Sequence, residues 1–234
     1  MASLIASIIT TARSQLNETT EKFWFDFELA DYADKAVKDL WRAINDNFQH
    51  YFLTIDETNV SQPSGATQLT GVPADVSIVR GLEPRELNLR PGLNYEARDY
   101  NAIDFMRARA LGQQDPSYGV KVLYCITQAG APIGAPTIEV RPQLSATIPL
   151  RLTYVPTLET IDEDSLNPIP GESYNAIMAW VVAYALAREA EDKLPHAGWL
   201  AIYATEKTNL LVALTPRQTD DDTVAEALFE DYWQ

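Results

Sequence analysis

The chain has 234 residues, of which 46% are hydrophobic and 22% are charged, an ordinary composition for a globular protein. Its formal net charge is −15, which argues against a protein that grips nucleic-acid phosphates with a cationic surface. The single cysteine, Cys125, excludes an intramolecular disulfide. The longest apolar stretch, Ala176–Ala187, is shorter than the about 20 residues that a membrane span needs. We therefore expect no membrane association, and the first residues lack the basic segment of a signal peptide.

Charge is distributed unevenly along the chain. Residues 1–60 hold 5 Lys and Arg against 10 Asp and Glu, residues 61–160 hold 9 against 9, and residues 161–234 hold 4 against 14. In the middle region every cation except Lys121 is an arginine, which favours protein–protein contacts because its planar guanidinium pairs with carboxylates and stacks on aromatic rings. The arginines predicted to contact other protein subunits are Arg80, Arg85, Arg90, Arg107 and Arg109.

Helical spacing of apolar residues dominates the first 50 residues. It predicts a short helix over 3–16 and a longer helix that begins at Asp26, its expected N-cap, and ends near Phe48. The aromatic cluster Phe23-Trp24-Phe25 lies between them. Such a cluster is more often part of a core, or a contact with a neighbouring subunit, than a ligand slot.

Alternating β-branched and aromatic residues predict strands in the middle of the chain. We expect a turn at Ser61–Gly65 and a helix over 97–111 within this region. Pro149 predicts that the last strand either begins there or lies at a sheet edge. The expected strands are 51–55, 76–82, 120–127, 137–141 and 146–154.

Helices return after an acidic linker at residues 156–170. An alanine-rich helix is expected over 173–191, and a second helix with Pro195 in its first turn ends before Pro216. Two helices on each side of the middle region cannot each build a good core alone. The sequence therefore predicts an α+β fold with three parts. Residues 1–50 and 160–215 form one helical bundle, residues 51–159 form an inserted β-rich domain, and residues 216–234 form a C-terminal docking arm.

The C-terminal arm ends in an amphipathic, aromatic segment after an acidic stretch. Such an end is typical of a peptide that docks on another chain, because aromatic anchors contribute much of the energy at interfaces. The alternative is that it folds back on its own bundle. The predicted docking residues are Leu228, Phe229, Tyr232 and Trp233.

Residues capable of catalysis or metal binding are present but match no motif. His50 and His196 have no Ser, Cys or Glu partner at a recognisable motif spacing. The acidic run Asp162–Asp164 lacks the ligand spacing of a calcium loop, and the glycine-containing segments lack that of a phosphate loop. Cys125 lies in a strand pattern and is expected to be a buried structural thiol. We therefore expect no catalytic residue, no metal and no cofactor.

Three segments carry a resemblance to a known family. They are Phe23–Tyr32 ahead of the second helix, Leu150–Pro156 at the end of the β region, and Ile169–Ile177 at the start of the alanine-rich helix. In this order, over nearly the whole chain, they resemble the head-to-tail adaptor proteins of tailed bacteriophages, also called connector or tail tubular A-like proteins.

The resemblance implies a structural protein of the virion neck and tail, assembled in the host cytoplasm as a dodecameric ring beneath the portal protein. The helical part would line the ring and the C-terminal arm would reach the portal. The β-rich domain would contact the tail nozzle, the next tail ring or neighbouring copies, and DNA would pass through without specific binding. Two alternatives remain open: a monomeric binding module whose β domain holds a small ligand, and a hydrolase that uses carboxylates.

Overall fold

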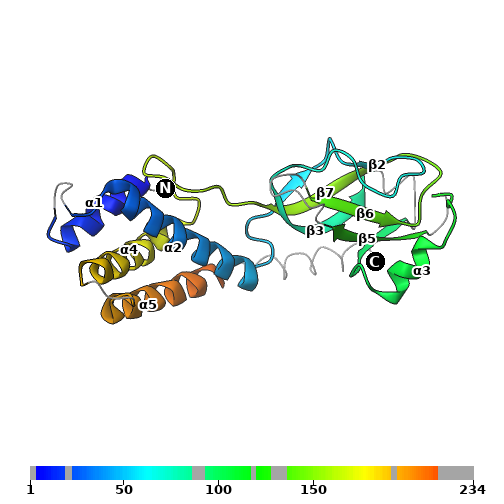
Figure 1. Ribbon diagram of the computed structural model, residues 1–234. Helices are drawn as coiled ribbons and strands as arrows, with labels where there is room; N and C mark the ends of the chain where they lie inside the picture. Colours follow the sequence, from blue (N-terminus) through cyan, green and yellow to red (C-terminus); the bar gives the residue numbers. More distant parts are fainter. Residues whose placement is uncertain are drawn as a thin grey trace, which may run out of the picture. The chain divides into compact units, whose positions relative to one another are not determined.

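The computed structural model describes residues 4–18, 23–85, 93–116, 120–127, 136–190 and 194–215. The chain divides into two compact units. The helical unit combines the described residues up to Tyr51 with those from Leu158 onward, and the β unit spans Phe52–Thr157. Helices and sheets are both present, so the α+β class predicted from the sequence is confirmed (Figure 1).

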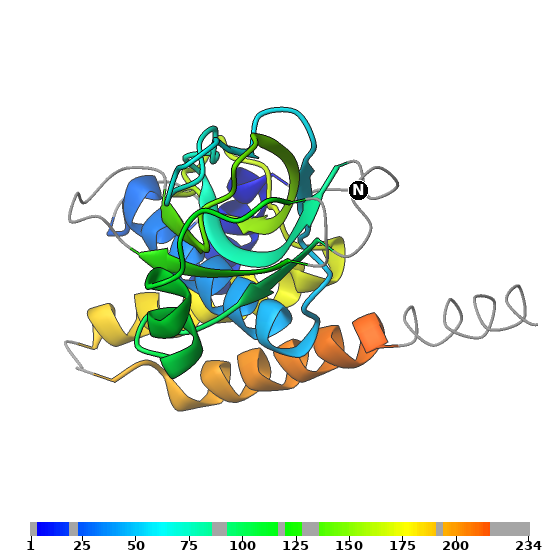
Figure 2. The same ribbon diagram turned by 90° about the vertical axis from the view of Figure 1, so that its right-hand side faces the viewer.

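The helical unit is built around one central helix. It contains α1 (Ile5–Gln15), α2 (Asp26–Asn47), α4 (Tyr174–Glu189) and α5 (Ala197–Leu214). Helix α4 packs against the other three, and Figures 1 and 2 show α1 and α5 on opposite sides of it. Its buried residues include Ile177, Val181 and Val182 together with five alanines, so it is apolar on most of its circumference. A helix of that kind has to be covered on several sides, which requires helices from both ends of the chain.

The acidic segment that leads into α4 is anchored to the helical unit and is not only a solvated linker. The carboxylate of Asp34, 5% exposed on α2, accepts the main-chain N–H of Ile161 at 3.0 Å. Lys38 pairs with the same carboxylate at 2.6 Å. Leu4 and Leu166 form an antiparallel bridge that holds the segment beside the start of α1.

The start of α2 differs from the prediction. The N-cap is Phe25, and Asp26 is the first residue of the helix. The Glu28 side chain accepts the Phe25 main-chain N–H at 3.2 Å and so completes the cap, which leaves the Asp26 carboxylate to bind Arg13 at 2.6 Å. Trp24 is buried, and its indole N–H donates to the main-chain oxygen of Ala185 at 3.1 Å.

Helix α5 is attached to α2 and α4 by polar contacts. The Tyr203 hydroxyl donates to the Asp39 carboxylate, which also binds Lys207 at 2.6 Å. The N-cap of α5 is His196, whose main-chain N–H donates to the Ala183 oxygen at 3.0 Å. Pro195 therefore precedes the helix, contrary to the prediction that it lies in the first turn.

In the β unit, β7 (Ile148–Pro156) is the strand on which the first sheet is built. It pairs antiparallel with β1 (Thr54–Asp56), β2 (Ser61–Gln62) and β3 (Val76–Pro84). Because β7 pairs with three strands, it does not lie at a sheet edge, and this alternative for the strand that contains Pro149 is wrong. Pro149 donates no hydrogen bond, but it occurs at the second residue, where its oxygen accepts the Arg85 N–H at 3.1 Å and the ladder continues.

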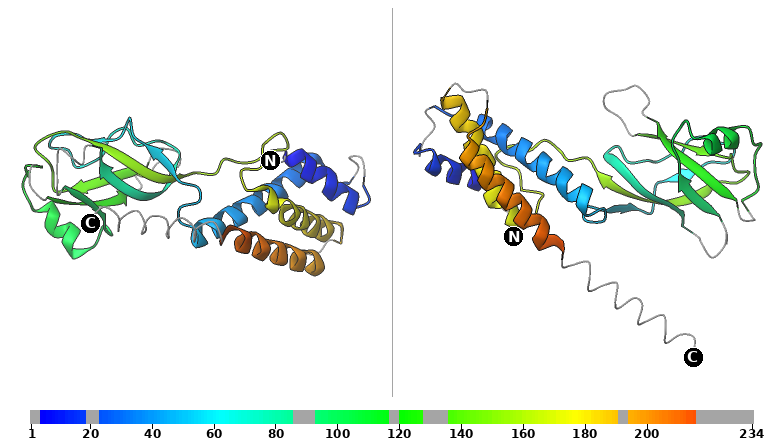
Figure 3. Two further views of the ribbon diagram at one scale, coloured as in Figure 1. Left: turned by 180° about the vertical axis from the view of Figure 1, so that it is seen from behind. Right: turned by 90° about the horizontal axis from the view of Figure 1, so that it is seen from below.

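The second sheet combines parallel and antiparallel pairs. β4 (Asn94–Ala97) is parallel to β5 (Lys121–Thr127), which is antiparallel to β6 (Thr137–Arg141). The helix α3 (Ile103–Arg109) connects β4 to β5 and packs on β5 and β6 (Figure 3). Apolar residues of both sheets share one core, which includes Val122, Val140, Leu150 and Leu152.

Two local expectations in the β unit are corrected. The expected helix over 97–111 is limited to α3, and Ala97, its first expected residue, is instead the last residue of β4. The expected turn at Ser61–Gly65 begins two residues later, because Ser61 and Gln62 pair with β7 and the Ala66 N–H then donates to the Pro63 oxygen at 3.1 Å.

We expect Asp34→Ala to lower the free energy of unfolding of the helical unit by about 1–3 kcal/mol, because the Ile161 N–H would lose its acceptor in a buried position. Urea unfolding followed by circular dichroism measures this difference. Asp31→Ala is the matched control: its carboxylate pairs with Lys35 on the exposed side of α2, and it should cost about 0.5 kcal/mol or less. Equal effects of the two substitutions would contradict the anchoring role of Asp34.

The Asp39 contacts predict a dependence of stability on pH. Burial raises the pKa of Asp39, but the hydrogen bonds from Lys207 and Tyr203 and the nearby positive charges lower it by more. The pKa of Asp39 therefore lies below its usual 3.8. A depressed carboxyl pKa stabilises the fold at neutral pH, and this contribution is lost as the pH falls through the folded-state pKa. Asp39→Asn should therefore be less stable than the wild type near pH 7, with the difference narrowing below pH 3.8.

Chemical unfolding at a series of pH values measures this dependence. Asp46→Asn, a substitution at an exposed position of the same helix, should leave the stability unchanged at each pH. A wild-type advantage over Asp39→Asn that stays constant into the acid range would contradict the assignment.

Candidate functional site

In the part of the chain that the structure describes, no three His, Cys, Asp or Glu side chains gather into a group that could hold a metal ion. Among the helices that the structure describes, none is both long and apolar enough to cross a membrane.

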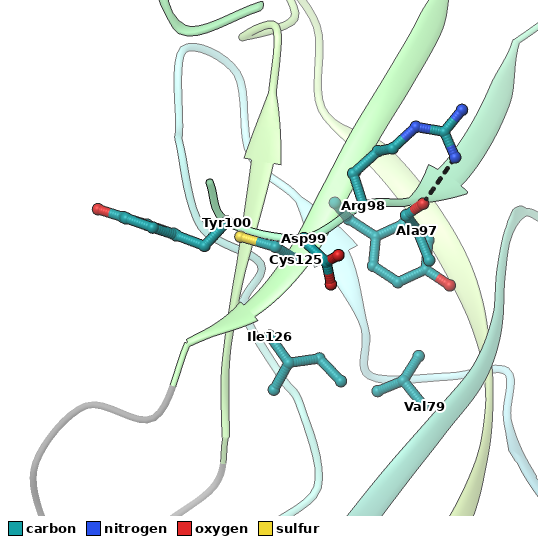
Figure 4. A pocket seen from close by; sticks show the side chains of 8 residues that line it. Val79, Ala97, Arg98, Asp99, Tyr100, Cys125 and Ile126 are labelled. Carbon is teal, nitrogen blue, oxygen red and sulfur yellow. Dashed lines mark hydrogen bonds between the residues drawn. The ribbon is translucent and has the colours of Figure 1, made fainter. Parts of the chain in front are cut away.

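A pocket of about 450 Å³ lies in the β unit, beside the end of β4 (Figure 4). Val79 of β3 forms one wall, residues 97–100 form a second, and residues 124–126 of β5 form the third. Figure 4 shows the side chains of Arg98 and Tyr100 directed away from each other, with the Asp99 carboxylate between them. The lining is therefore mixed apolar and polar.

Two residues that line this pocket, Cys125 and Arg98, have environments that define their chemistry. Cys125 is buried, as expected, and burial together with the negative charge of Glu139 raises the pKa of its thiol. A thiol with a raised pKa is a poor nucleophile at neutral pH. Arg98 pairs with Glu96 and donates to the Ala97 oxygen at 3.1 Å, so its charge is already partly balanced.

Arg109, a predicted contact residue, is bound within the β unit. Its guanidinium binds the Glu139 carboxylate through two nitrogens, at 3.3 and 3.0 Å, and lies 4.0 Å from the ring centre of Tyr100. Arg141 pairs with the same carboxylate at 3.0 Å. This network holds α3 against β6, so the main contacts of Arg109 are structural.

The other predicted arginines are separated along the β unit. Arg107 is exposed on α3, and Arg80 is half-buried on β3. Arg85 directly follows β3, where its side-chain Nε donates to the Leu150 oxygen at 3.2 Å and its chain remains exposed. Arg90 lies outside the described residues. The structure therefore places Arg107 and Arg85 as the more accessible of these cations.

Sequence reasoning missed an exposed apolar surface on α3. The sequence predicted a helix here without saying which of its apolar residues are buried, and of its large apolar side chains only Phe105 is fully buried. Ile103 and Met106 are 68% and 50% exposed, and Leu111 just beyond the helix is 54% exposed. Exposed apolar residues grouped in this way are typical of an interaction surface.

The outward side of α5 carries a second surface of this kind, which we call the α5 outer face. Ala201, Thr205, Thr208 and Val212 recur at i, i+4, i+7 and i+11 and are all exposed. The two charged residues of α5, Glu206 and Lys207, lie outside this stripe.

A third exposed surface lies at the start of α2. The rings of Phe25 and Phe27 stack with a centre-to-centre distance of 5.6 Å, and the two side chains are 47% and 69% exposed. Of the predicted aromatic cluster, Trp24 therefore belongs to the core, whereas Phe25 extends this exposed stack.

The two histidines and the acidic run noted in the sequence lie at exposed positions. His50 is exposed after α2, and His196 caps α5. The carboxylate of Asp162 accepts the hydroxyl of Ser165 at 2.6 Å at the exposed surface. The docking residues of the arm, Leu228, Phe229, Tyr232 and Trp233, lie outside the described residues.

Comparison with known proteins leaves the family of the chain open. A scan against protein-family models finds no match, and a search of curated proteins finds no similar sequence.

We expect Arg109→Ala to lower the melting temperature of the chain by several degrees, because Glu139 would keep only Arg141 as a cationic partner and Tyr100 would lose its stacked guanidinium. Arg107→Ala, on the exposed side of the same helix, is the control and should leave the melting temperature nearly unchanged. Differential scanning fluorimetry measures both. Equal melting temperatures for the two variants would mean that the contacts of Arg109 with Glu139 and Tyr100 do not stabilise the fold.

Proposed function

We propose that the chain is a structural head-to-tail adaptor of a tailed-phage virion, which forms a ring between the portal and the tail and lets DNA pass. The proposal combines the resemblance over nearly the whole chain with one physical observation, the separation of charge between the two units. It assigns no enzymatic activity and no cofactor to the chain.

The charge separation carries the proposal. The β unit, residues 52–157, holds 9 Lys and Arg against 10 Asp and Glu, whereas the rest of the chain holds 9 against 23. Of these, residues 216–234 hold 1 against 6, so the sequence that supplies the helical unit holds 8 against 17 and is strongly acidic. An acidic wall repels phosphates, so DNA can slide along it without being held. This suits helices that line a DNA channel.

The β unit has the surface of a protein-binding domain in this proposal. Its cations are nearly balanced by its acids, so it does not repel other acidic proteins as the helical unit does. The apolar residues Ile103 and Met106 beside Arg107 supply a contact area for tail components or neighbouring copies. The pocket beside β4 favours the second candidate, a binding module for a small polar ligand, and saturable ligand binding by a stable monomer would favour that candidate.

Deletion of Arg217–Gln234 should abolish attachment to the portal, because the proposal places the aromatic anchors Leu228, Phe229, Tyr232 and Trp233 in that contact. Co-expression with the portal protein, followed by affinity purification and quantification of the portal, measures attachment. The helical content of the truncated chain should stay near that of the full chain, as shown by circular dichroism.

A matched control changes the charge of the arm without removing its anchors. Substitution of Asp220, Asp221 and Asp222 by asparagine should leave most of the attachment intact. If the truncated chain recovers as much portal as the full chain, the assignment of the arm to portal binding is wrong.

A further inference from the structure

We infer that the α5 outer face of one copy of this chain binds the Phe25–Phe27 stack of the next copy, so that two different surfaces of the helical unit form a repeating head-to-tail contact. The inference rests on the proposed ring and names the surfaces that would close it.

The α5 outer face is uncharged in an otherwise acidic unit. Its threonine hydroxyls are already used within the helix, since Thr205 donates to the Ala201 oxygen at 3.0 Å and Thr208 donates to the Ala204 oxygen at 2.9 Å. The face therefore presents methyl groups to solvent, and Val212 at its end is 64% exposed. Two acidic copies repel one another over most of their surface, but contact at this face adds no repulsion between carboxylates.

The Phe25–Phe27 stack has the complementary properties. It is a large exposed aromatic pair, of the kind that anchors interfaces. Asp31 and Glu163 line the same shallow pocket as Phe27, so an acidic partner would be repelled there. An uncharged surface of small side chains can approach the two rings closely, which is what the α5 outer face offers.

The two surfaces point in different directions from one rigid helical unit. Phe27 precedes Asp34 by seven residues and shares its side of α2, where Asp34 binds the returning segment. Asp39, which binds Tyr203 and Lys207 of α5, lies about 140° further around the same helix. A contact between two different surfaces of identical copies is heterologous, and it generates a ring when the rotation between copies closes.

Single substitutions separate the two surfaces. Thr208→Glu places a charge at the centre of the α5 outer face and improves helix propensity, so folding should be preserved. Phe27→Asp removes the more exposed ring and adds a charge. Each variant alone should associate with itself about tenfold more weakly or worse than the wild type. Thr208→Glu brings a negative charge toward Asp31 and Glu163 of the next copy, and Phe27→Asp replaces an aromatic anchor by a carboxylate that the uncharged α5 outer face would desolvate. Sedimentation velocity over a concentration series up to the solubility limit, without portal, measures this.

An equimolar mixture of the two variants gives the decisive test. Thr208→Glu keeps an intact aromatic stack and Phe27→Asp keeps an intact α5 outer face, so the mixture should form a dimer and nothing larger. A matched control should associate like the wild type: Thr10→Glu changes an exposed threonine with the same kind of hydroxyl hydrogen bond on α1.

Three results would overturn the inference: variants that associate like the wild type, a mixture that stays monomeric, or a wild-type chain that is monomeric at every concentration. A chain ending at Thr215 should still self-associate; if it does not, the C-terminal arm is the occupant of the α5 outer face and the inference is wrong. Failure of the adaptor proposal would look different. The wild-type chain would form rings, but affinity purification of these rings would recover neither portal nor tail proteins.

Discussion

The hydrogen bond from the Ile161 main chain to the buried Asp34 carboxylate marks the constraint on which the rest of the structure depends. Helices α1 and α2 alone leave their apolar sides uncovered, and α4 is apolar on most of its circumference. These elements form a core only when the chain returns after roughly a hundred residues. The entropy of closing such a loop grows slowly with its length, so a whole folded unit can lie between the two halves.

This arrangement links the fold to the proposed adaptor. Because both ends of the chain build the helical unit, the acidic segments near residues 160 and 30 belong to one body and concentrate its negative charge. The uncharged α5 outer face and the exposed Phe25–Phe27 stack are the contacts with other copies that we infer for that body. The β unit, nearly neutral and with exposed apolar residues on α3, is free to serve a different partner.

The sequence predicted the long elements well because their periodicity extends over several turns. Helices α2 and α4 and the strands β5, β6 and β7 all lie close to their expected ranges. β4 was not predicted because a four-residue strand that pairs in parallel has too little alternation to be recognised. For Pro149, the alternative of a strand that begins there agrees with β7, which begins one residue earlier, whereas the edge alternative is wrong because β7 pairs with several strands.

The surfaces were less predictable than the elements. The sequence predicted α5 but not which of its apolar residues are exposed: α4 and α2 contact it, and Val212 and Ile202 are left exposed. Arg109 differs from Arg107 through its contacts with Tyr100 and Glu139, and Glu139 lies on β6, which pairs with β5. Such contacts depend on the tertiary fold, so sequence spacing does not show them.

The most direct test of the adaptor proposal is negative-stain imaging of the protein purified from its native source with the proteins bound to it. The proposal predicts a ring with a central channel attached to a second ring, and isolated small particles without a stoichiometric partner would contradict it.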